Sequence, residues 1–491
     1  MSHSDSAADS SPDRERAGTD GDRSGTDGDR PSSDGGRSGT DGDRSGADAR
    51  LPPKLDSPPL VGNTLQFVRD PFGFYDLLDS RGEAVRYEVA RQEFCTVFEP
   101  AYVQRILVEE NEKYVKAEML QEAAAGFAEQ GLLLTEGEVW RDQRVRVQPA
   151  FTPEKIRSYT DAMVRYAEES GDRFSDGDVV NVEDAMSEVT LKILAKSLFD
   201  VDVAGRREVV REAAAALNAR GDASGASAFL PDWVPTPKNR RFRRAMADFE
   251  EMVDDLIAER RETDDAESPD DLLSILLDAE GPDGTTMDDD VVRDQMVTFL
   301  FAGHETTALA LTYAWHLLGR NPETLDRLRA ELDAELGDRR ATMADLPALD
   351  YTERVVNEAL RLFPPAYVLF REPTEEVRVG PHRVREGTAM TIPIFKLHRD
   401  GRFYDAPDEF RPERWTDEFE EELPEYAYLP FGGGPRHCIG MRFALAELKL
   451  VLATLAREVA FDPTYDGDPD LSMAATMRPD QPMTMRVRRR E

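Results

Sequence analysis

The pattern of apolar and polar positions divides the chain into a polar N-terminal segment and a long region that can fold. Residues 1–50 are mainly Asp, Gly, Ser and Arg with almost no apolar residue, and a seven-residue unit, Ala17–Arg23, recurs twice with little change. Such a segment cannot bury enough apolar surface to offset the entropy lost on ordering. We therefore predict a disordered, acidic, low-complexity tail over residues 1–50. Because the composition does not shift again, we predict one folded domain over residues 51–491.

Most apolar positions of the folded domain recur with helical spacing. A helical stretch opens at Pro71, and the chain is mostly helical from about Glu109 onward. Alternation over residues 84–90 and 96–98 predicts a short β-hairpin, and a second β-rich interval lies around residues 377–394. The predicted fold class is mainly α with small β-sheets.

One predicted helix is much longer than the others. It begins at the aspartates 288–290 and ends at Gly319, shortly before Pro322. Its roughly thirty residues would extend about 45 Å, enough to cross a domain. The polar stretch Gly303–Thr307 interrupts it and leaves neither side the ~20 apolar residues that a membrane span needs. We predict a buried core helix.

The polar residues at the middle of this helix are unfavourable or neutral in a helix core, and such local conflicts are typical of functional sites. We expect Gly303 to leave space for a flat ligand. Thr306 can donate a hydrogen bond to the carbonyl of Ala302, four residues back, and so bend the helix. The widened groove could hold dioxygen and a water, with Glu305 supplying protons. The alternative is a satisfied polar pocket in a helix bundle.

The net charge excludes some classes of partner. The chain has 61 Lys and Arg against 98 Asp and Glu, a formal charge of −37. Such a chain is unsuited to nucleic acid or to a polyanionic membrane surface. Lysine is also scarce, with nine lysines and 52 arginines. We interpret this surface as that of a salt-loving organism, where screening tolerates self-repulsion; an ordinary acidic protein is the alternative.

Two cysteines, Cys95 and Cys438, are too few for a four-thiolate metal site or a disulfide framework. A reducing cytoplasm fits this number. The N-terminus carries no apolar run that resembles a signal peptide or a membrane anchor. We therefore expect a soluble cytoplasmic protein without a membrane anchor.

The strongest chemical signal is the loop Phe431–Gly440. It contains four glycines, a cation at Arg436 and the cysteine Cys438, and an alanine-rich helical pattern follows over residues 443–455. Glycines allow close approach of the backbone, and the N-terminal end of a helix favours a thiolate. An axial thiolate ligand of haem iron requires this environment. The alternatives are an ordinary turn with a buried cysteine, or a phosphate loop, although no Lys-Ser/Thr pair follows the glycines.

Two further constellations have an ordinary and a functional interpretation. Trp140 and Arg144 are four residues apart and share a helical face, where the ordinary interpretation is a cation–π contact. Glu358 and Arg361 form an i,i+3 pair inside an apolar helix, and Arg414 follows in an arginine-rich turn. On an exposed face such pairs contribute little. If buried, the loss of one member costs several kcal/mol.

Taken together, these motifs resemble those of the cytochrome P-450 superfamily. They occur in the same order as in that family, and the resemblance runs from about Leu51 to the C-terminus. The resemblance implies a single large helical domain that holds haem b between the long central helix and the helix after the cysteine loop. It implies that Cys438 ligates the iron and that Glu305 and Thr306 are the catalytic acid and alcohol. The implied cofactor-binding residues are Cys438, Arg436, Phe431, Trp140, Arg144 and Arg371.

The resemblance also implies structural and substrate-binding residues. Glu358, Arg361 and Arg414 correspond to a triad that fixes the backbone leading to the cysteine loop. His398 belongs to a recurrent stretch of the family, and we assign it no catalytic role. The residues expected to line the substrate pocket are Phe299, Ala302, Ala366 and Val368.

The implied activity is that of a haem-thiolate monooxygenase, which inserts one oxygen atom of O2 into a C–H bond of an apolar small molecule. No flavin or nicotinamide domain is fused, so a separate ferredoxin or flavodoxin would supply electrons. One alternative is a peroxide-driven peroxygenase or an isomerase of the same fold, although such relatives commonly lack the acid–alcohol pair. A haem sensor or gas-binding protein is the non-enzymatic alternative. Fatty acid, terpenoid and carotenoid-derived substrates all stay open.

Overall fold

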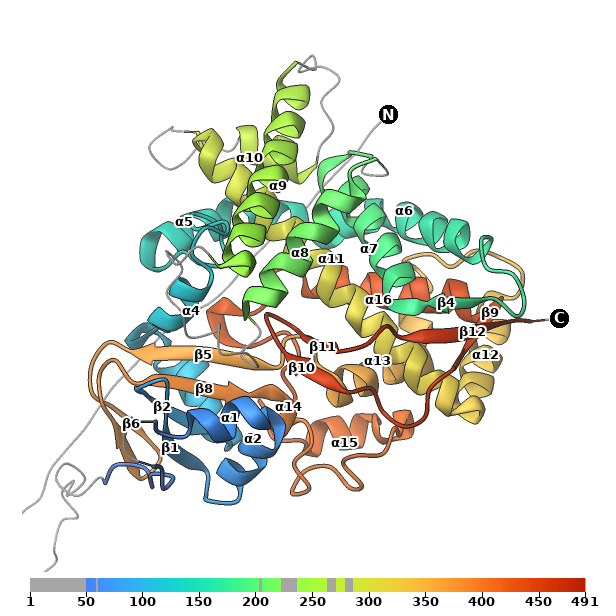
Figure 1. Cartoon of the computed structure of the whole chain (residues 1–491). Coiled ribbons are helices and arrows are strands. Elements are labelled where there is room, and N and C mark those ends of the chain that lie inside the picture. Colours follow the sequence, from blue (N-terminus) through green and yellow to red (C-terminus); the bar gives the residue numbers. More distant parts are fainter. Residues whose placement is uncertain are drawn as a thin grey trace, which may run out of the picture. The chain divides into compact units, whose positions relative to one another are not determined.

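Figure 1 shows the computed structural model of the chain, which describes residues 50–58, 61–202, 205–221, 236–262, 271–278 and 286–490. The tail predicted over residues 1–50 lies outside the described residues except for Arg50, and it stays a prediction. Residues Ala49–Glu491 form one compact unit, to which everything below refers.

Helices make up most of this unit, as predicted. The α-helices are α1 (Thr64–Arg69), α2 (Pro71–Asp79), α3 (Pro100–Gln104), α4 (Glu118–Ala123), α5 (Gly137–Val147), α6 (Pro153–Gly171), α7 (Val182–Phe199), α8 (Arg207–Gly221), α9 (Pro237–Arg261), α10 (Leu272–Asp278), α11 (Asp289–Arg320), α12 (Pro322–Leu336), α13 (Asp350–Leu362), α14 (Ile394–Leu397), α15 (Asp417–Glu422) and α16 (Met441–Ala456). The shorter helical turns are η1 (Arg105–Glu109), η2 (Asn111–Lys113), η3 (Gln148–Phe151), η5 (Leu346–Ala348), η6 (Pro412–Arg414) and η7 (Gly434–Arg436).

Helix α11 is the long central helix that the sequence predicts. It has 32 residues, its N-cap is Asp288, and it packs against α7, α9, α13 and α16 (Figure 1). Pro322 opens the next helix, so the chain turns immediately after α11. Among the described residues, no helix combines the length and the apolar character needed to cross a membrane.

The strands form small separate sheets. They are β1 (Ala84–Val89), β2 (Gln92–Val97), β3 (Tyr114–Val115), β4 (Val179–Asn181), β5 (Val368–Pro373), β6 (Val377–Val379), β7 (His382–Val384), β8 (Ala389–Pro393), β9 (Val459–Pro463), β10 (Leu471–Met473), β11 (Met477–Pro479) and β12 (Thr484–Arg489). The largest sheet has the order β1-β2-β8-β5-β3, and a three-stranded sheet has the order β4-β12-β9. The fold is therefore mainly α with small sheets, as the sequence predicts.

The predicted hairpin is β1–β2, an antiparallel pair in which Val89 faces Gln92. Its turn residues, Ala90 and Arg91, have φ angles of 53° and 70°, a left-handed conformation that glycine or asparagine usually occupies. Strands β3, β4 and β5 and the four C-terminal strands β9–β12 are not predicted by the sequence analysis.

The largest core cluster surrounds α11 and draws on α6, α7, α9 and α16. A second cluster fills the space between the first helices, the five-stranded sheet and the C-terminal half of α11. Because α11 contributes to both clusters, its side chains are buried almost all round. Any gap in that burial is therefore informative.

Candidate functional site

The burial of α11 has one gap. Between Asp294 and Leu318 every residue is buried except Ala302, Gly303 and Thr306, which are half-buried. Ala302 and Thr306 lie one turn apart and therefore on the same face of the helix. The gap coincides with the stretch that the sequence analysis selects for its polar residues.

Thr306 makes the backbone contact that the sequence predicts. Its Oγ1 donates a hydrogen bond to the carbonyl oxygen of Ala302 at 2.7 Å, and Thr307 Oγ1 donates to Gly303 at 3.0 Å. The helix nevertheless continues without interruption from Asp289 to Arg320. The Thr306 hydroxyl is thus fixed on the half-buried face while the helix stays intact.

Gly303 has a different role from the one we expected. A Cβ atom at this position would overlap the side chain of Leu194 on α7. The glycine therefore allows α7 to pack closely on α11, and the expectation that it leaves space for a flat ligand is wrong. Ala302 and Thr306 therefore form the half-buried face next to Gly303.

The Glu305 side chain lies away from this face, in a polar environment. Its Oε1 accepts hydrogen bonds from Asn218 Nδ2 of α8 and, at 3.1 Å, from Thr476 Oγ1. Arg478 lies 3.7 Å from the same oxygen. Burial raises the pKa of the Glu305 carboxyl, although Arg478, Asn218 and Thr476 lower it. Glu305 is thus more easily protonated than an exposed glutamate.

A polar cavity of about 270 Å³ reaches Glu305 on this side of α11. Residues of α7, α8, α11, β11 and the segment after β11 line it, among them Glu183, Ser187, Arg211, Glu305, Arg478 and Asp480. Such a lining can hold water next to a proton-exchanging carboxyl. Glu305 therefore connects a polar cavity with the helix turn that carries Thr306.

The cysteine loop is closed by a backbone hydrogen bond from Cys438 N to Phe431 O at 2.9 Å. At Gly434, φ is +66° and a Cβ atom would overlap the carbonyl of Leu107 in η1, so only glycine fits there. The glycine thus lets the loop approach the chain's own backbone. Helix α16 begins at Met441, three residues after the cysteine, close to the start that the sequence predicts.

Cys438 is accessible to solvent, whereas Cys95 is buried. Protein atoms nevertheless surround the Cys438 thiol closely enough for desolvation to raise its pKa, while the Gly440 N–H and the charge of Arg144 lower it. The Gly440 N–H and Arg144 thus favour the thiolate, but desolvation outweighs them and the net direction is upward; a thiolate in this loop stays a prediction. A bound metal ion would deprotonate the thiol.

Aromatic side chains connect the cysteine loop with α11. The ring of Phe151 lies 5.5 Å from the ring of Phe299 on α11. A Cβ atom on Gly440 would lie 3.8 Å from Phe151 and 3.9 Å from Cys438 Sγ. Phe431 is half-buried and packs on the same core cluster. The loop and the centre of α11 therefore belong to one region of the core.

Cationic side chains gather beside the loop. Arg436 donates to Thr135 O at 2.9 Å, forms an ion pair with Glu136 and lies 3.9 Å from the centre of the Trp140 ring. Arg371 is half-buried and donates to Phe370 O at 2.8 Å, and desolvation lowers its pKa. The predicted residues Trp140, Arg371 and Arg436 thus lie in one neighbourhood.

Arg144 holds the loop from outside, because its Nη1 donates to the carbonyl oxygen of His437 at 2.9 Å. His437 is the neighbour of Cys438 in the chain. The structure thus brings Arg144 to the cysteine loop. The cation–π contact with Trp140 that the sequence suggested for Arg144 is made by Arg436 instead.

Sequence reasoning missed Lys116. Its Nζ donates to Thr135 O at 3.1 Å and lies 3.7 Å from Glu136 Oε1. Burial, followed by the charge of Arg436, lowers the pKa of Lys116 to about 7. The signal was available, because a lysine is rare in this chain and this one lies between Val115 and Ala117.

This set of donors fits haem. Lys116, Arg371 and Arg436 surround Glu136, which leaves an excess of partly buried positive charge. Such an excess is unfavourable by itself and is suited to a ligand that carries two carboxylates. The accessible sulfur of Cys438 is the kind of ligand that haem-thiolate iron would require.

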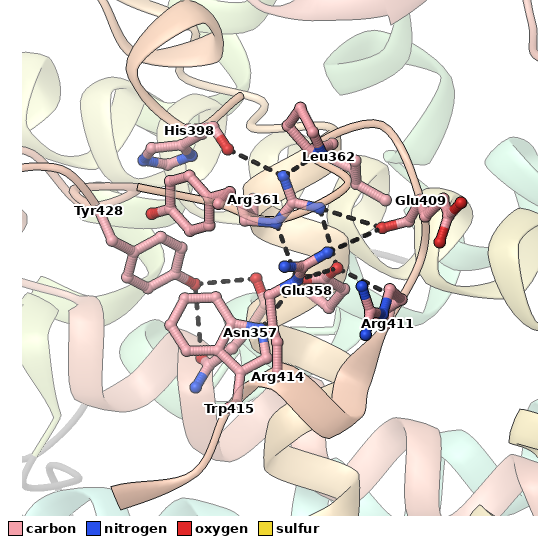
Figure 2. Close-up of polar contacts among 12 residues, drawn as sticks. Asn357, Glu358, Arg361, Leu362, His398, Glu409, Arg411, Arg414, Trp415 and Tyr428 are labelled. Carbon is pink, nitrogen blue, oxygen red and sulfur yellow. Dashed lines mark hydrogen bonds and ion pairs between the residues drawn. The ribbon is translucent and has the colours of Figure 1, made fainter. Parts of the chain in front are cut away.

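Figure 2 shows that Glu358, Arg361 and Arg414 meet. The Glu358 carboxylate accepts five hydrogen bonds, from Arg361 Nε and Nη2, Arg414 Nε, Trp415 Nε1 and the Arg411 backbone N–H. Glu358 and Arg361 are completely buried. The charges of the three residues are therefore paired inside the protein.

The same group reaches the cysteine loop through His398. Arg361 Nη1 donates to His398 O at 2.9 Å (Figure 2). The Leu429 backbone N–H donates to His398 Nε2 at 2.9 Å. Leu429 lies two residues before Phe431. Burial lowers the pKa of His398 to about 3, so the ring stays neutral and Nε2 can accept. His398 thus links the buried charges to the loop.

The four residues predicted to line the substrate pocket differ in exposure. Phe299 is buried, Ala302 and Val368 are half-buried, and Ala366 is exposed. Val368 begins β5 and pairs with Pro393 of β8. Their role in binding a substrate stays a prediction.

Comparisons with known proteins agree with this arrangement. The family description "Cytochrome P-450" matches residues 52–486. "Cyclooctatin synthase" of Streptomyces melanosporofaciens is 35% identical over 81% of this chain and 87% of its own length. "Cyclooctat-9-en-7-ol 5-monooxygenase" of the same organism is 35% identical over 82% and 87%. "Pentalenene oxygenase" of Streptomyces avermitilis is 30% identical over 88% and 95%.

Proposed function

The chain belongs to the cytochrome P-450 superfamily and is a monooxygenase, and from this premise we propose that it inserts one oxygen atom of O2 into a C–H bond of an apolar small molecule. The observation that carries the proposal is the accessible Cys438 sulfur beside an excess of cations. The half-buried turn of α11 at Ala302 and Thr306 supports it.

The cofactor proposed is haem b, held by Cys438 at the iron. Arg371, Arg436 and Lys116 would pair with its carboxylates, with Trp140 packed on Arg436 and Arg144 holding the loop. When bound, haem supplies the activation of O2 and the transfer of its oxygen atom. The protein supplies the sulfur ligand, the counter-charges and the shape of the site.

Two residues of α11 are proposed to handle protons. The Thr306 hydroxyl uses its hydrogen on Ala302 O, so its oxygen is left to accept a hydrogen bond on the half-buried face. Glu305 has a raised pKa and borders the polar cavity, so it can hold a proton and exchange it with water there. Together they would deliver protons to the oxygen-binding side.

The proposed substrate is small and largely apolar. Phe299, Ala302 and Val368 would present hydrocarbon surface to it. The names "Cyclooctat-9-en-7-ol 5-monooxygenase" and "Pentalenene oxygenase" denote enzymes that act on an unsaturated alcohol and on an unsaturated hydrocarbon. This favours an unsaturated alcohol or hydrocarbon as the substrate here. A ferredoxin or flavodoxin is proposed as electron donor, because monooxygenases of this superfamily imply a redox partner. Two unpaired cysteines fit a reducing cytoplasm.

A substrate screen tests this proposal. Purified ferric protein in high salt is titrated with cyclic alkenes, alkenols and fatty acids, and a shift of the Soret band reports binding. A compound that binds is then incubated with surrogate redox proteins, and the product is analysed for one added oxygen atom. A protein that binds and turns over none of these classes, but turns over with hydrogen peroxide alone, would instead be a peroxygenase.

The replacement Cys438→Ser tests the ligand. The variant loses the sulfur that would bind iron, so we expect the thiolate-specific absorbance band of the reduced carbon monoxide complex to disappear. Cys95→Ser is the matched control, because Cys95 is buried in another core cluster and should leave the band unchanged. If the band survives in Cys438→Ser, another residue holds the iron.

A further inference from the structure

The Glu305 carboxylate is held from two segments that are far apart in the sequence. Asn218 lies near the C-terminal end of α8, and Thr476 lies between β10 and β11. Both donate to the same oxygen, Oε1, and Thr476 Oγ1 also lies 3.4 Å from Asn218 Oδ1. The other oxygen, Oε2, has no hydrogen-bond partner among the residues that the structure describes.

This asymmetry decides which oxygen carries a proton. In a protonated carboxyl group one oxygen is a donor and the other is mainly an acceptor. Because Oε1 already accepts from Asn218 and Thr476, the proton belongs on Oε2. The two donors therefore select both the orientation of the carboxyl group and the oxygen from which a proton leaves.

Titratable groups from the elements around the cavity line it together with Glu305. On α7 they are Glu183 and Asp184, on α8 Arg211, on α11 His304, and on the C-terminal segment Arg478 and Asp480. Arg478 pairs with Glu183 at 2.6 Å and lies farther, 3.7 Å, from Glu305. Arg478 therefore interacts mainly with Glu183. The hydrogen bonds that hold the Glu305 carboxylate come from the neutral donors Asn218 and Thr476.

We propose that Asn218 and Thr476 are positioning residues for Glu305, which fix its Oε1 so that Oε2 is the oxygen that holds and releases the proton. The inference rests on the proposed function, because it gives Glu305 its proton-delivering role. Asn218 and Thr476 act through the carboxyl group from α8 and from the β10–β11 turn.

The replacements Thr476→Val and Asn218→Leu remove the donors with little change in volume. Thr476→Ser keeps the hydroxyl and is the conservative rescue. Thr190→Val is the matched control, because Thr190 is buried and donates to the backbone oxygen of His304 at 3.0 Å without touching the Glu305 carboxylate. All four variants are compared with wild-type holoprotein.

The first readout is the pH dependence of unfolding, which does not depend on turnover. Glu305 has a folded pKa above its unfolded value, so its contribution to stability falls as pH rises through the folded pKa. Loss of a donor raises that pKa further, so Thr476→Val and Asn218→Leu should lower the urea midpoint more at pH 8 than at pH 5. Thr190→Val should lower it equally at both pH values.

The second readout is turnover. Thr476→Val and Asn218→Leu should lower product formation by on the order of tenfold, part of what a general acid contributes. They should also release more hydrogen peroxide. The alkaline limb of the pH–rate profile should move to higher pH, because the pKa of Glu305 rises. Thr476→Ser should restore the wild-type values. A merely structural role would change the stability without moving the profile.

Two outcomes overturn the inference while leaving the proposed function intact. One is a wild-type pH–rate profile and coupling in Thr476→Val and Asn218→Leu when the wild type turns over. The other is a stability loss in these variants that is equal at pH 5 and pH 8. If the wild type makes no product but the unfolding difference still grows with pH, the proposed function fails and the positioning of Glu305 stands.

Discussion

Two completely buried glutamates, Glu358 and Glu447, have opposite surroundings. The Glu358 carboxylate accepts five hydrogen bonds, which pair its charge. Both oxygens of Glu447 on α16 have no hydrogen-bond partner among the described residues. Burial alone therefore raises the pKa of Glu447 well above its usual value. A buried charge without partners is costly, so the neutral form is favoured.

Glu447→Gln tests this difference. Because the folded pKa of Glu447 lies above the unfolded one, the wild type loses stability as pH rises from about 4.5 through the folded pKa. The glutamine does not titrate, so from pH 4.5 to pH 8 the variant should gain on the wild type by at least about 1.4 kcal/mol, the equivalent of one pKa unit. Urea unfolding at pH 8 and at pH 4.5, where the carboxyl is neutral in both states, measures it. A variant that gains nothing on the wild type between these pH values would contradict the prediction.

The sequence predicted the contacts of residues whose partners are close in the chain. It did not predict contacts with partners that are far away in the chain. The Thr306 contact follows from helix geometry, because its acceptor lies four residues back. The role of Gly303 depends on Leu194, which comes from another helix. Burial, followed by the charge of Arg436, lowers the pKa of Lys116, and Arg436 is more than 300 residues away in the chain. The local chemistry of the site was predictable, and its charge balance was not.

At the scale of elements, α13 and the segment before the cysteine loop are joined by the buried charges of Glu358, Arg361 and Arg414. Arg361 also donates to the backbone oxygens of His398, Pro407 and Glu409, and Arg414 to those of Asp405 and Ala406. These carbonyls belong to an irregular stretch that has few other partners. The three side chains therefore act as a clamp on the backbone that leads to Cys438.

Glu358→Gln should break this clamp. The variant leaves two arginines without their buried counter-charge, so we expect a loss of about 3–5 kcal/mol in the free energy of unfolding. The cysteine loop depends on His398, so the haem content of the purified protein should fall as well. Arg488→Ala is the control, because its ion pair with Asp462 is exposed and should contribute less than about 1 kcal/mol. Equal losses in both variants would show that burial of the charges does not matter.

The elements themselves were predicted unevenly. The long helix begins and ends within one residue of its predicted limits, because its aspartates and its Gly–Pro stop are local signals. The β1–β2 hairpin is local as well. Strand β12 pairs with β4, about 300 residues earlier in the chain, and with β9. Short strands with such distant partners carry little periodicity of their own, so the C-terminal sheets were missed.

At the scale of the whole molecule, the formal charge of −37 opposes compaction. The N-terminal segment accounts for a small part of it, because residues 1–48 contain 12 acidic residues and six arginines. Most of the excess charge therefore belongs to the unit that folds. Salt also weakens the exposed ion pairs, but each of these contributes about 0–1 kcal/mol.

The balance of these two effects predicts a protein that salt stabilises. The Debye length falls from about 10 Å at 0.1 M to about 3 Å at 1 M, so repulsion between like charges across the surface is largely removed. We expect the urea midpoint to rise steadily between 0.1 and 1 M KCl. An uncharged osmolyte at equal osmolality controls for exclusion from the surface. A chain without residues 1–48 should respond as the full chain does, because it keeps most of the negative charge. A midpoint that falls with KCl would mean that the ion pairs outweigh the net charge, and the interpretation of the surface as salt-adapted would then be wrong.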